Sequence, residues 1–120
     1  MVIPLAAEKG VGIIARVPLA SGWLTGKYNA DSKFAANEAR STTFSAAVIE
    51  DAAAQVGQLD FLLDEADSMV DAALRFILSN PGVSTVIPGA KNRAQRRQNI
   101  SSSGKKLSES ALEKVRELFG

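Results

Sequence analysis

Residues 87–92 hold the residue types best suited to chemistry, because together they could bind an anion. An apolar run ends there and a basic run begins. The backbone N–H groups after Gly89 and the N-terminus of a following helix could hold a phosphate. Positive charge close by comes from Lys91, Arg93, Arg96 and Arg97. Alternatively, Asn92 and Gln95 form a pair that resembles a capping box, and the arginines only face solvent.

A second candidate binding segment, residues 16–22, also follows an apolar run. The planar guanidinium of Arg16 could stack on a flat ring or pair with an anion. The alternative is a surface arginine whose aliphatic stem passes the rim of a sheet. Ser21 and Gly22 could donate hydrogen bonds to phosphate oxygens, although a serine-glycine turn needs no ligand.

The sequence does not support a P-loop, a nucleic-acid interface, a metal site or an acid/base pair. Residues 22–28 imitate a P-loop, but the glycine spacing is one residue short and Lys27 is not followed by serine or threonine. The basic stretch at 88–106 has no interleaved aromatic residue, so we predict no nucleic-acid binding. Without histidine or cysteine the chain lacks the usual zinc ligands, so we predict no metal site and no disulfide. Acidic pairs such as Asp64 and Asp67 are expected to face water.

Two apolar runs are expected to form the strands that position both binding segments. Residues 11–15 are almost continuously apolar, and residues 83–87 are rich in β-branched side chains. Continuous apolarity is typical of strands covered on both faces by helices, which indicates a parallel sheet. Ligands in such folds gather at the carboxyl ends of the strands. We therefore expect Arg16 and Lys91 at the same end of the sheet.

Helices are predicted before and between the strands. A first helix ends within residues 4–9, and residues 31–43 read as a polar loop. Helical structure begins at Phe44 and is interrupted near Gly57. A longer helix is expected over residues 61–79, where apolar side chains recur at helical spacing.

Two more helices are predicted after the second strand. Asn92 is expected to cap a helix that reaches about Ser101, and Ser108 to cap the last helix. Leu107 and Leu112 are placed to pack on each other across the start of that last helix, as a hydrophobic staple. Its buried side is expected to hold Ala111, Val115, Leu118 and Phe119.

These elements make a βαβα unit with additional helices, which belongs to the α/β class. Two strands cannot close a barrel, so their edges should be exposed unless something else covers them. The 120 residues amount to one domain or less, and 46% apolar and 22% charged residues are ordinary for a soluble chain. No apolar run approaches the ~20 residues that span a bilayer, and no signal peptide is apparent. We therefore expect no membrane partner and a cytoplasmic location.

Three ordered motifs resemble one known family. Residues 10–28 resemble the seventh strand and following loop of the aldo-keto reductases. Residues 72–78 and 82–90 are similar to the seventh helix and eighth strand of that family, and Gln95 and Asn99 stand where its pattern has Gln-x-x-x-Asn. The resemblance implies part of a (β/α)8 TIM barrel that binds NADP(H) and reduces aldehydes or ketones. Residues 1–120 would be a carboxyl-terminal fragment of such an oxidoreductase domain.

The resemblance also assigns cofactor contacts by position. Arg16 would lie against the nicotinamide, where many members carry an aromatic residue. The loop along the pyrophosphate would consist of Pro18, Leu19, Ser21 and Gly22. The adenosine end with its 2′-phosphate would meet Gly89, Ala90, Lys91, Gln95 and Asn99. Gln98 departs from the glutamate that is common at its position, so the resemblance does not assign the adenine contact of that glutamate to this chain.

The residues that catalyse the family's reaction are not expected in this chain. The family's aspartate, tyrosine, lysine and histidine lie on earlier strands, the chain has no histidine, and Tyr28 is in the wrong segment. We therefore predict no catalytic residue here and no catalysis by this chain alone. Met1 could be an internal methionine or the start of a remnant gene. The alternative function is a noncatalytic module that binds nucleotide weakly, self-associates or pairs with a complementary barrel fragment.

Overall fold

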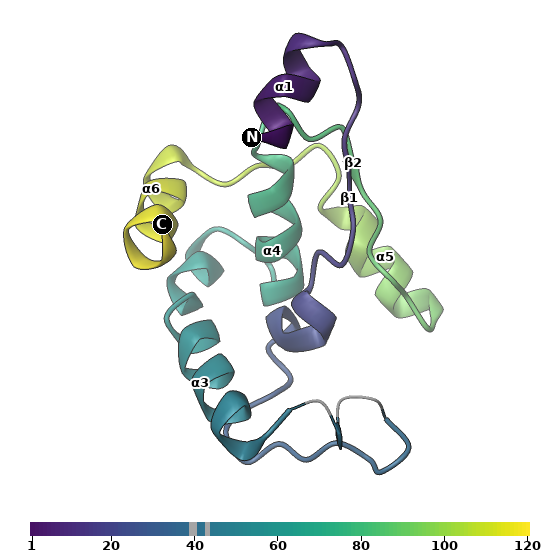
Figure 1. The fold of residues 1–120 in the computed structure, drawn as a ribbon, viewed down its shortest axis with the longest axis vertical. Coiled ribbons are helices and arrows are strands. Elements are labelled where there is room, and N and C mark those ends of the chain that lie inside the picture. Colours follow the sequence, from purple (N-terminus) through teal and green to yellow (C-terminus); the bar gives the residue numbers. More distant parts are fainter. Residues whose placement is uncertain (39–40, 43) are drawn as a thin grey trace.

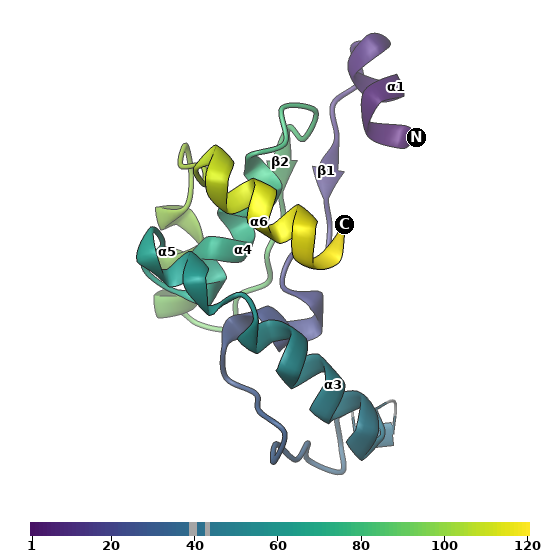
Figure 2. The ribbon, with the colours of Figure 1, turned by 90° about the vertical axis from the view of Figure 1, so that its left-hand side faces the viewer.

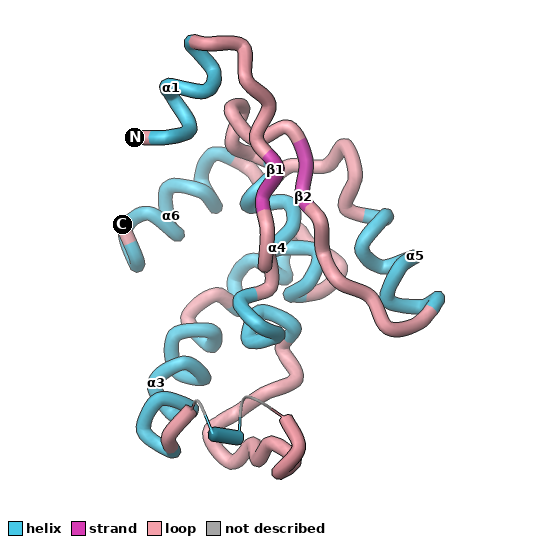
Figure 3. Tube along the Cα trace, turned by 45° about the vertical axis from the view of Figure 1, so that its right-hand side comes forward, coloured by secondary structure: helices cyan, strands magenta, loops and turns pink. Residues whose placement is uncertain are grey.

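Two short parallel strands form the sheet of a computed structural model that describes residues 1–38, 41–42 and 44–120. Strand β1 (Ile14–Ala15) pairs with β2 (Thr85–Val86), with Ile14 opposite Thr85 (Figure 3). The parallel pairing confirms the prediction from apolarity. Both strands are shorter than predicted, partly because a side chain interrupts the ladder: the N–H of Ile13 donates to Ser84 Oγ at 3.0 Å.

Helices precede, connect and follow the two strands along the chain, as Figure 1 shows. They are α1 (Val2–Glu8), α3 (Ala46–Gly57), α4 (Met69–Leu78), α5 (Arg93–Ser101) and α6 (Glu109–Phe119), with two 3-10 helices, η1 (Ala20–Thr25) and η2 (Asp60–Asp64). Helix α4 is central, with α5 on one side and α3 and α6 toward the other (Figures 1 and 2). None of the helices in the described part of the chain is long and apolar enough to cross a membrane.

The prediction of a single long helix over residues 61–79 is wrong. The chain instead forms η2, leaves helical geometry at residues 65–68 and restarts as α4. Ser68 has an extended backbone and its Oγ accepts the N–H of Asp71 at 3.1 Å. A serine that accepts this bond offers the backbone an alternative to continuing the helix, which explains the break.

The apolar core includes Leu74 of α4, which is 0% exposed, and one cluster of buried side chains where α4 meets η2 and α6. The members of this cluster are Leu62, Ala66, Ala72, Leu107, Ala111 and Leu112. Leu107 and Leu112 are both buried in this cluster, as the predicted staple requires. The prediction that Leu118 and Phe119 are buried is wrong, because 40% and 46% of these residues is exposed. They occupy the last turn of α6, beyond the residues that η2 covers.

Exposed apolar side chains lie on and next to the two strands, whose outer edges are also unpaired in the described part of the chain. Ile14 on β1 and Ile87 just after β2 are 60% and 54% exposed, and Val11 and Val17 on either side of β1 are equally open. Each strand has one hydrogen-bonded neighbour in the described part of the chain. The expectation of exposed edges is therefore confirmed.

Candidate functional site

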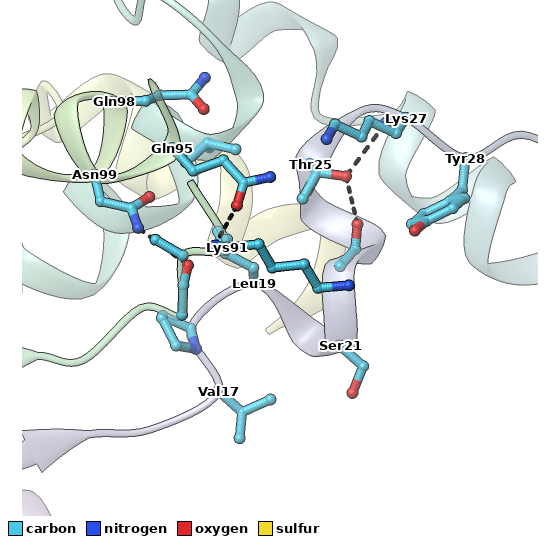
Figure 4. A pocket seen from close by; sticks show the side chains of 15 residues that line it. Val17, Leu19, Ser21, Thr25, Lys27, Tyr28, Lys91, Gln95, Gln98 and Asn99 are labelled. Carbon is cyan, nitrogen blue, oxygen red and sulfur yellow. Dashed lines mark hydrogen bonds between the residues drawn. The ribbon is translucent and has the colours of Figure 1, made fainter. Parts of the chain in front are cut away.

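A pocket of about 480 Å³ opens at the carboxyl ends of both strands. One wall is the loop after β1 and the other is the start of α5 (Figure 4). Val70 of α4 also lines the pocket. The lining residues are Val17, Pro18, Leu19, Ser21, Gly22, Thr25, Lys27, Tyr28, Val70, Gly89, Ala90, Lys91, Gln95, Gln98 and Asn99. Such a volume suits a small organic ligand.

The loop after β1 has a strained backbone. Val17, Ala20 and Ser21 have positive φ angles of 51°, 48° and 59°, and Gly22 follows at 98°. Residues other than glycine rarely adopt a positive φ, and for the β-branched Val17 this backbone conformation is a true outlier. Two hydrogen bonds hold the turn, from the Ala20 N–H to the Val17 carbonyl and from the Gly22 N–H to the Leu19 carbonyl. Backbone strain of this kind concentrates at ligand sites.

An aromatic cluster packs around Trp23, directly after the strained residues of this loop. Trp23 is buried and makes edge contacts with Tyr28, Phe34 and Phe44, at centroid distances of 5.6 to 5.9 Å. The Thr25 hydroxyl donates to the Gly22 carbonyl at 2.6 Å. These contacts anchor the end of the strained turn, at Gly22 and Trp23, on a packed aromatic group, which favours one fixed shape for the loop.

The α5 wall is organised by reciprocal hydrogen bonds. Asn92 Oδ1 accepts the N–H of Gln95 at 2.9 Å, and Gln95 Oε1 accepts the N–H of Lys91 at 2.7 Å. Asn99 Nδ2 donates to the Gly89 carbonyl at 3.2 Å. The predicted capping pair is therefore present. The Lys91 side chain is not part of it, and Figure 4 shows it extended across the pocket toward η1.

Comparison with known proteins assigns the family. The sequence model of the aldo/keto reductase family matches residues 1–119. The chain belongs to the aldo/keto reductase family. Its curated relatives include aldo-keto reductase str7 of Strobilurus tenacellus, 34% identical over 94% of this chain. A probable voltage-gated potassium channel subunit beta of Arabidopsis thaliana is 35% identical over 82% of it. The chain spans about a third of each relative, 34% and 31% respectively.

A solved aldo-keto reductase barrel confirms the fold. The glycerol dehydrogenase AKR11B4 from Gluconobacter oxydans superimposes on 98% of this chain with a TM-score of 0.83, at 24% sequence identity. The match covers 36% of that protein. This member of the aldo/keto reductase family therefore has the architecture of part of a (β/α)8 barrel, as the resemblance in sequence implies.

Nine of the ten predicted cofactor contacts line the one pocket. They are Pro18, Leu19, Ser21, Gly22, Gly89, Ala90, Lys91, Gln95 and Asn99. Arg16 does not join them. It lines an adjoining, mainly apolar pocket of about 590 Å³, and Val17 and Pro18 are shared by both. Arg16 and Lys91 nevertheless follow the carboxyl ends of two parallel strands, so they lie at the same end of the sheet as predicted.

The pocket has properties that fit a phosphate-bearing dinucleotide. A Cβ added at Gly89 would meet no atom within 4 Å, so a ligand can approach this backbone closely. Lys91 supplies a cation beside the start of α5, where helix N–H groups favour anions. These residues thus fit the cofactor that the aldo/keto reductase family implies.

Six residues that line the pocket were not among the ten predicted contacts: Val17, Thr25, Lys27, Tyr28, Val70 and Gln98. Thr25, Lys27 and Tyr28 lie in the segment whose likeness to a P-loop fails, and the resemblance of residues 10–28 to the family loop assigned no cofactor contact to them. Val70 reaches the pocket only because α4 packs between the two walls, which no local pattern reveals. Gln98, which departs from the family pattern, is also in the lining.

Proposed function

We propose that this chain is the NADP(H)-binding end of an aldo-keto reductase that reduces aldehydes or ketones. The observation that carries the proposal is the single pocket shared by the strained loop after β1 and the Lys91 wall. In the family, the catalytic aspartate, tyrosine, lysine and histidine come from other strands, and this chain contains no histidine. We therefore assign cofactor binding, and no catalytic residue, to these 120 residues.

Different residues of this chain would contact different parts of the cofactor. Bound NADPH supplies hydride. Lys91 would pair with the 2′-phosphate, since residues 88–106 contain no acid to compete for it. The loop of Leu19 to Gly22 would lie along the pyrophosphate, and its fixed shape would lower the entropy cost of binding. Arg16, in the adjoining pocket, would meet the nicotinamide end.

A titration of the full chain with NADPH and NADH tests the proposal. Trp23 is the only tryptophan and packs on Tyr28 at the pocket, so its fluorescence reports binding. We expect tighter binding of NADPH, and a Lys91→Gln variant should lose about tenfold in NADPH affinity, because a charge-assisted hydrogen bond contributes about 1.5 to 3 kcal/mol. NADH affinity should change little.

The matched control is Lys106→Gln, which removes the same charge from an exposed position outside the pocket. It should leave both affinities near those of the wild type. Equal wild-type affinities for the two nucleotides would refute the 2′-phosphate assignment.

The exposed sheet edges favour a second candidate, a noncatalytic module that associates with a complementary barrel fragment. Ile14 and Ile87 present apolar side chains beside strands that still have free pairing edges. We expect self-association or capture of a fragment that supplies the other barrel strands, measured by size-exclusion chromatography with light scattering. A stable, compact monomer that does not bind the added fragment would exclude the noncatalytic association module.

A further inference from the structure

Helix α4 connects the two walls of the pocket. It packs against η1 on one side and against α5 on the other. Its first residues carry this connection: Met69 approaches Gly26 just after η1, and Val70 lines the pocket. The position of α5 relative to the strained loop therefore depends on how α5 is attached to the start of α4.

A buried carboxylate sits at that attachment. Asp71, on the first turn of α4, is 1% exposed. Arg75 pairs with both of its oxygens, with Nε 3.0 Å from Oδ1 and Nη2 2.5 Å from Oδ2. The N–H of Asp67 donates to Oδ2 at 3.0 Å. A bidentate arginine and further donors are what a buried charge requires.

The remaining bond to this carboxylate comes from α5. Ser102, the C-terminal cap residue of α5 and itself 1% exposed, donates its hydroxyl to Asp71 Oδ1 at 2.7 Å. A second tie runs from Gln98 Nε2 to Ser68 Oγ at 3.2 Å. Ser68 caps α4, so both bonds fasten α5 to the amino end of the same helix.

Burial alone would raise the pKa of Asp71. The hydrogen bonds from Arg75, Ser102 and the Asp67 N–H outweigh it, and the pKa lies below its ordinary value. The carboxylate therefore stays charged near neutral pH, and the bond from Ser102 is a charge-assisted one, about twice as strong as a neutral bond.

We infer that Asp71 and Ser102 are positioning residues for the cofactor site, which hold α5 so that Lys91, Gln95 and Asn99 face the strained loop. The inference rests on the proposed function. Ser102 is separated from Lys91 by the nine residues of α5, a length of roughly 14 Å at 1.5 Å per residue. A small tilt at the Ser102 end is therefore amplified at the phosphate-binding end, and neither residue lines the pocket itself.

The test compares NADPH and NADH affinities of the full chain in Ser102→Ala and Ser102→Cys variants. Alanine removes the hydroxyl, while cysteine keeps the size with a weak donor, so it covers the case in which alanine prevents folding. We expect the preference for NADPH to fall by about fivefold or more in the alanine variant and by less in the cysteine variant. Hydrogen exchange of the α5 amides should accelerate in the same order.

Two control variants separate positioning from a general loss of stability. Ser103→Ala changes the neighbouring, exposed serine. Ser45→Ala removes the side chain that caps α3, far from this attachment, and should cost about 1 kcal/mol of folding free energy. Neither should alter the ratio of the two affinities.

The outcomes distinguish this inference from the proposed function. A wild-type chain that binds neither nucleotide would overturn the proposed function, and the positioning role with it. A wild-type chain that prefers NADPH, with the same preference in both Ser102 variants or an equal loss in Ser45→Ala, would overturn the positioning role alone.

Discussion

Replacing Val17 with glycine should release backbone strain at the edge of the pocket. Val17 has a φ of 51°, a conformation that costs a non-glycine residue about 1 to 3 kcal/mol. The substitution also has costs: glycine loses about 0.5 to 1 kcal/mol in chain entropy. Because 61% of Val17 is exposed, lost apolar burial adds less than about 1 kcal/mol. These terms nearly cancel, so we expect stability within about 1 kcal/mol of the wild type.

Val11 provides a matched control for this measurement. It is 58% exposed, lies on the other side of β1 and has no positive φ. Val11→Gly carries the same costs without the release of strain, so it should be less stable than Val17→Gly by about 2 kcal/mol. Urea unfolding followed by circular dichroism measures the free energy of unfolding of both variants. In thermal unfolding, the midpoints of the two variants should differ by roughly 10 °C.

The same substitution should weaken cofactor binding, because a glycine at position 17 loosens a loop that is otherwise fixed in shape. Stability and affinity would then move in opposite directions relative to the Val11 control. Equal destabilisation by the two glycine substitutions would show that the backbone at Val17 stores no strain, and the argument for a preshaped loop would fail.

Two further changes test the packing and the electrostatics. The hydroxyl and then the N–H of Ser108 donate to the Glu65 carboxylate, both at 2.7 Å, and lower its pKa from the ordinary 4.5. A lowered pKa of Glu65 contributes stability that is present above the ordinary value of 4.5 and is lost as the pH falls through the lowered value. Glu65→Gln should therefore flatten the pH dependence of the urea midpoint below pH 4.5. An unchanged slope would contradict this. Leu74 is 0% exposed, and Leu74→Ala should lower the free energy of unfolding by about 2 to 5 kcal/mol, whereas a loss below 1 kcal/mol in urea would place it outside the core.

Local patterns were sufficient for the caps, the strand pairing and the location of the site. Asn92 and Ser108 cap their helices through their own side chains, and the signal for each lies within four residues of sequence. The two strands pair in parallel, as the continuous apolar runs predicted, although Ile14 and Ile87 are exposed and the expected cover on both faces is absent from the described part of the chain. Parallel pairing then places the following segments at one end, where the pocket forms.

Long-range contacts account for what the sequence did not predict. Asp71 stands on a helix among other acids and was indistinguishable from a solvent-facing carboxylate. Its partner Ser102 is 31 residues away, so their bond has no local signature. The interruption of the helix between η2 and α4 was not predicted, because apolar residues continue at helical spacing across residues 65–68. Arg16 lines the adjoining pocket rather than the predicted one, since the strained turn at Val17 separates the two.

The bond between Gln95 and the N–H of Lys91 has a consequence for selectivity. An incoming phosphate that takes this N–H displaces an amide oxygen, so one acceptor replaces another and the number of hydrogen bonds hardly changes. The gain in free energy must then come from charge, through the ammonium group. Discrimination between phosphorylated and unphosphorylated nucleotides would accordingly fade as ionic strength rises, and multivalent anions in a buffer would compete for the same position.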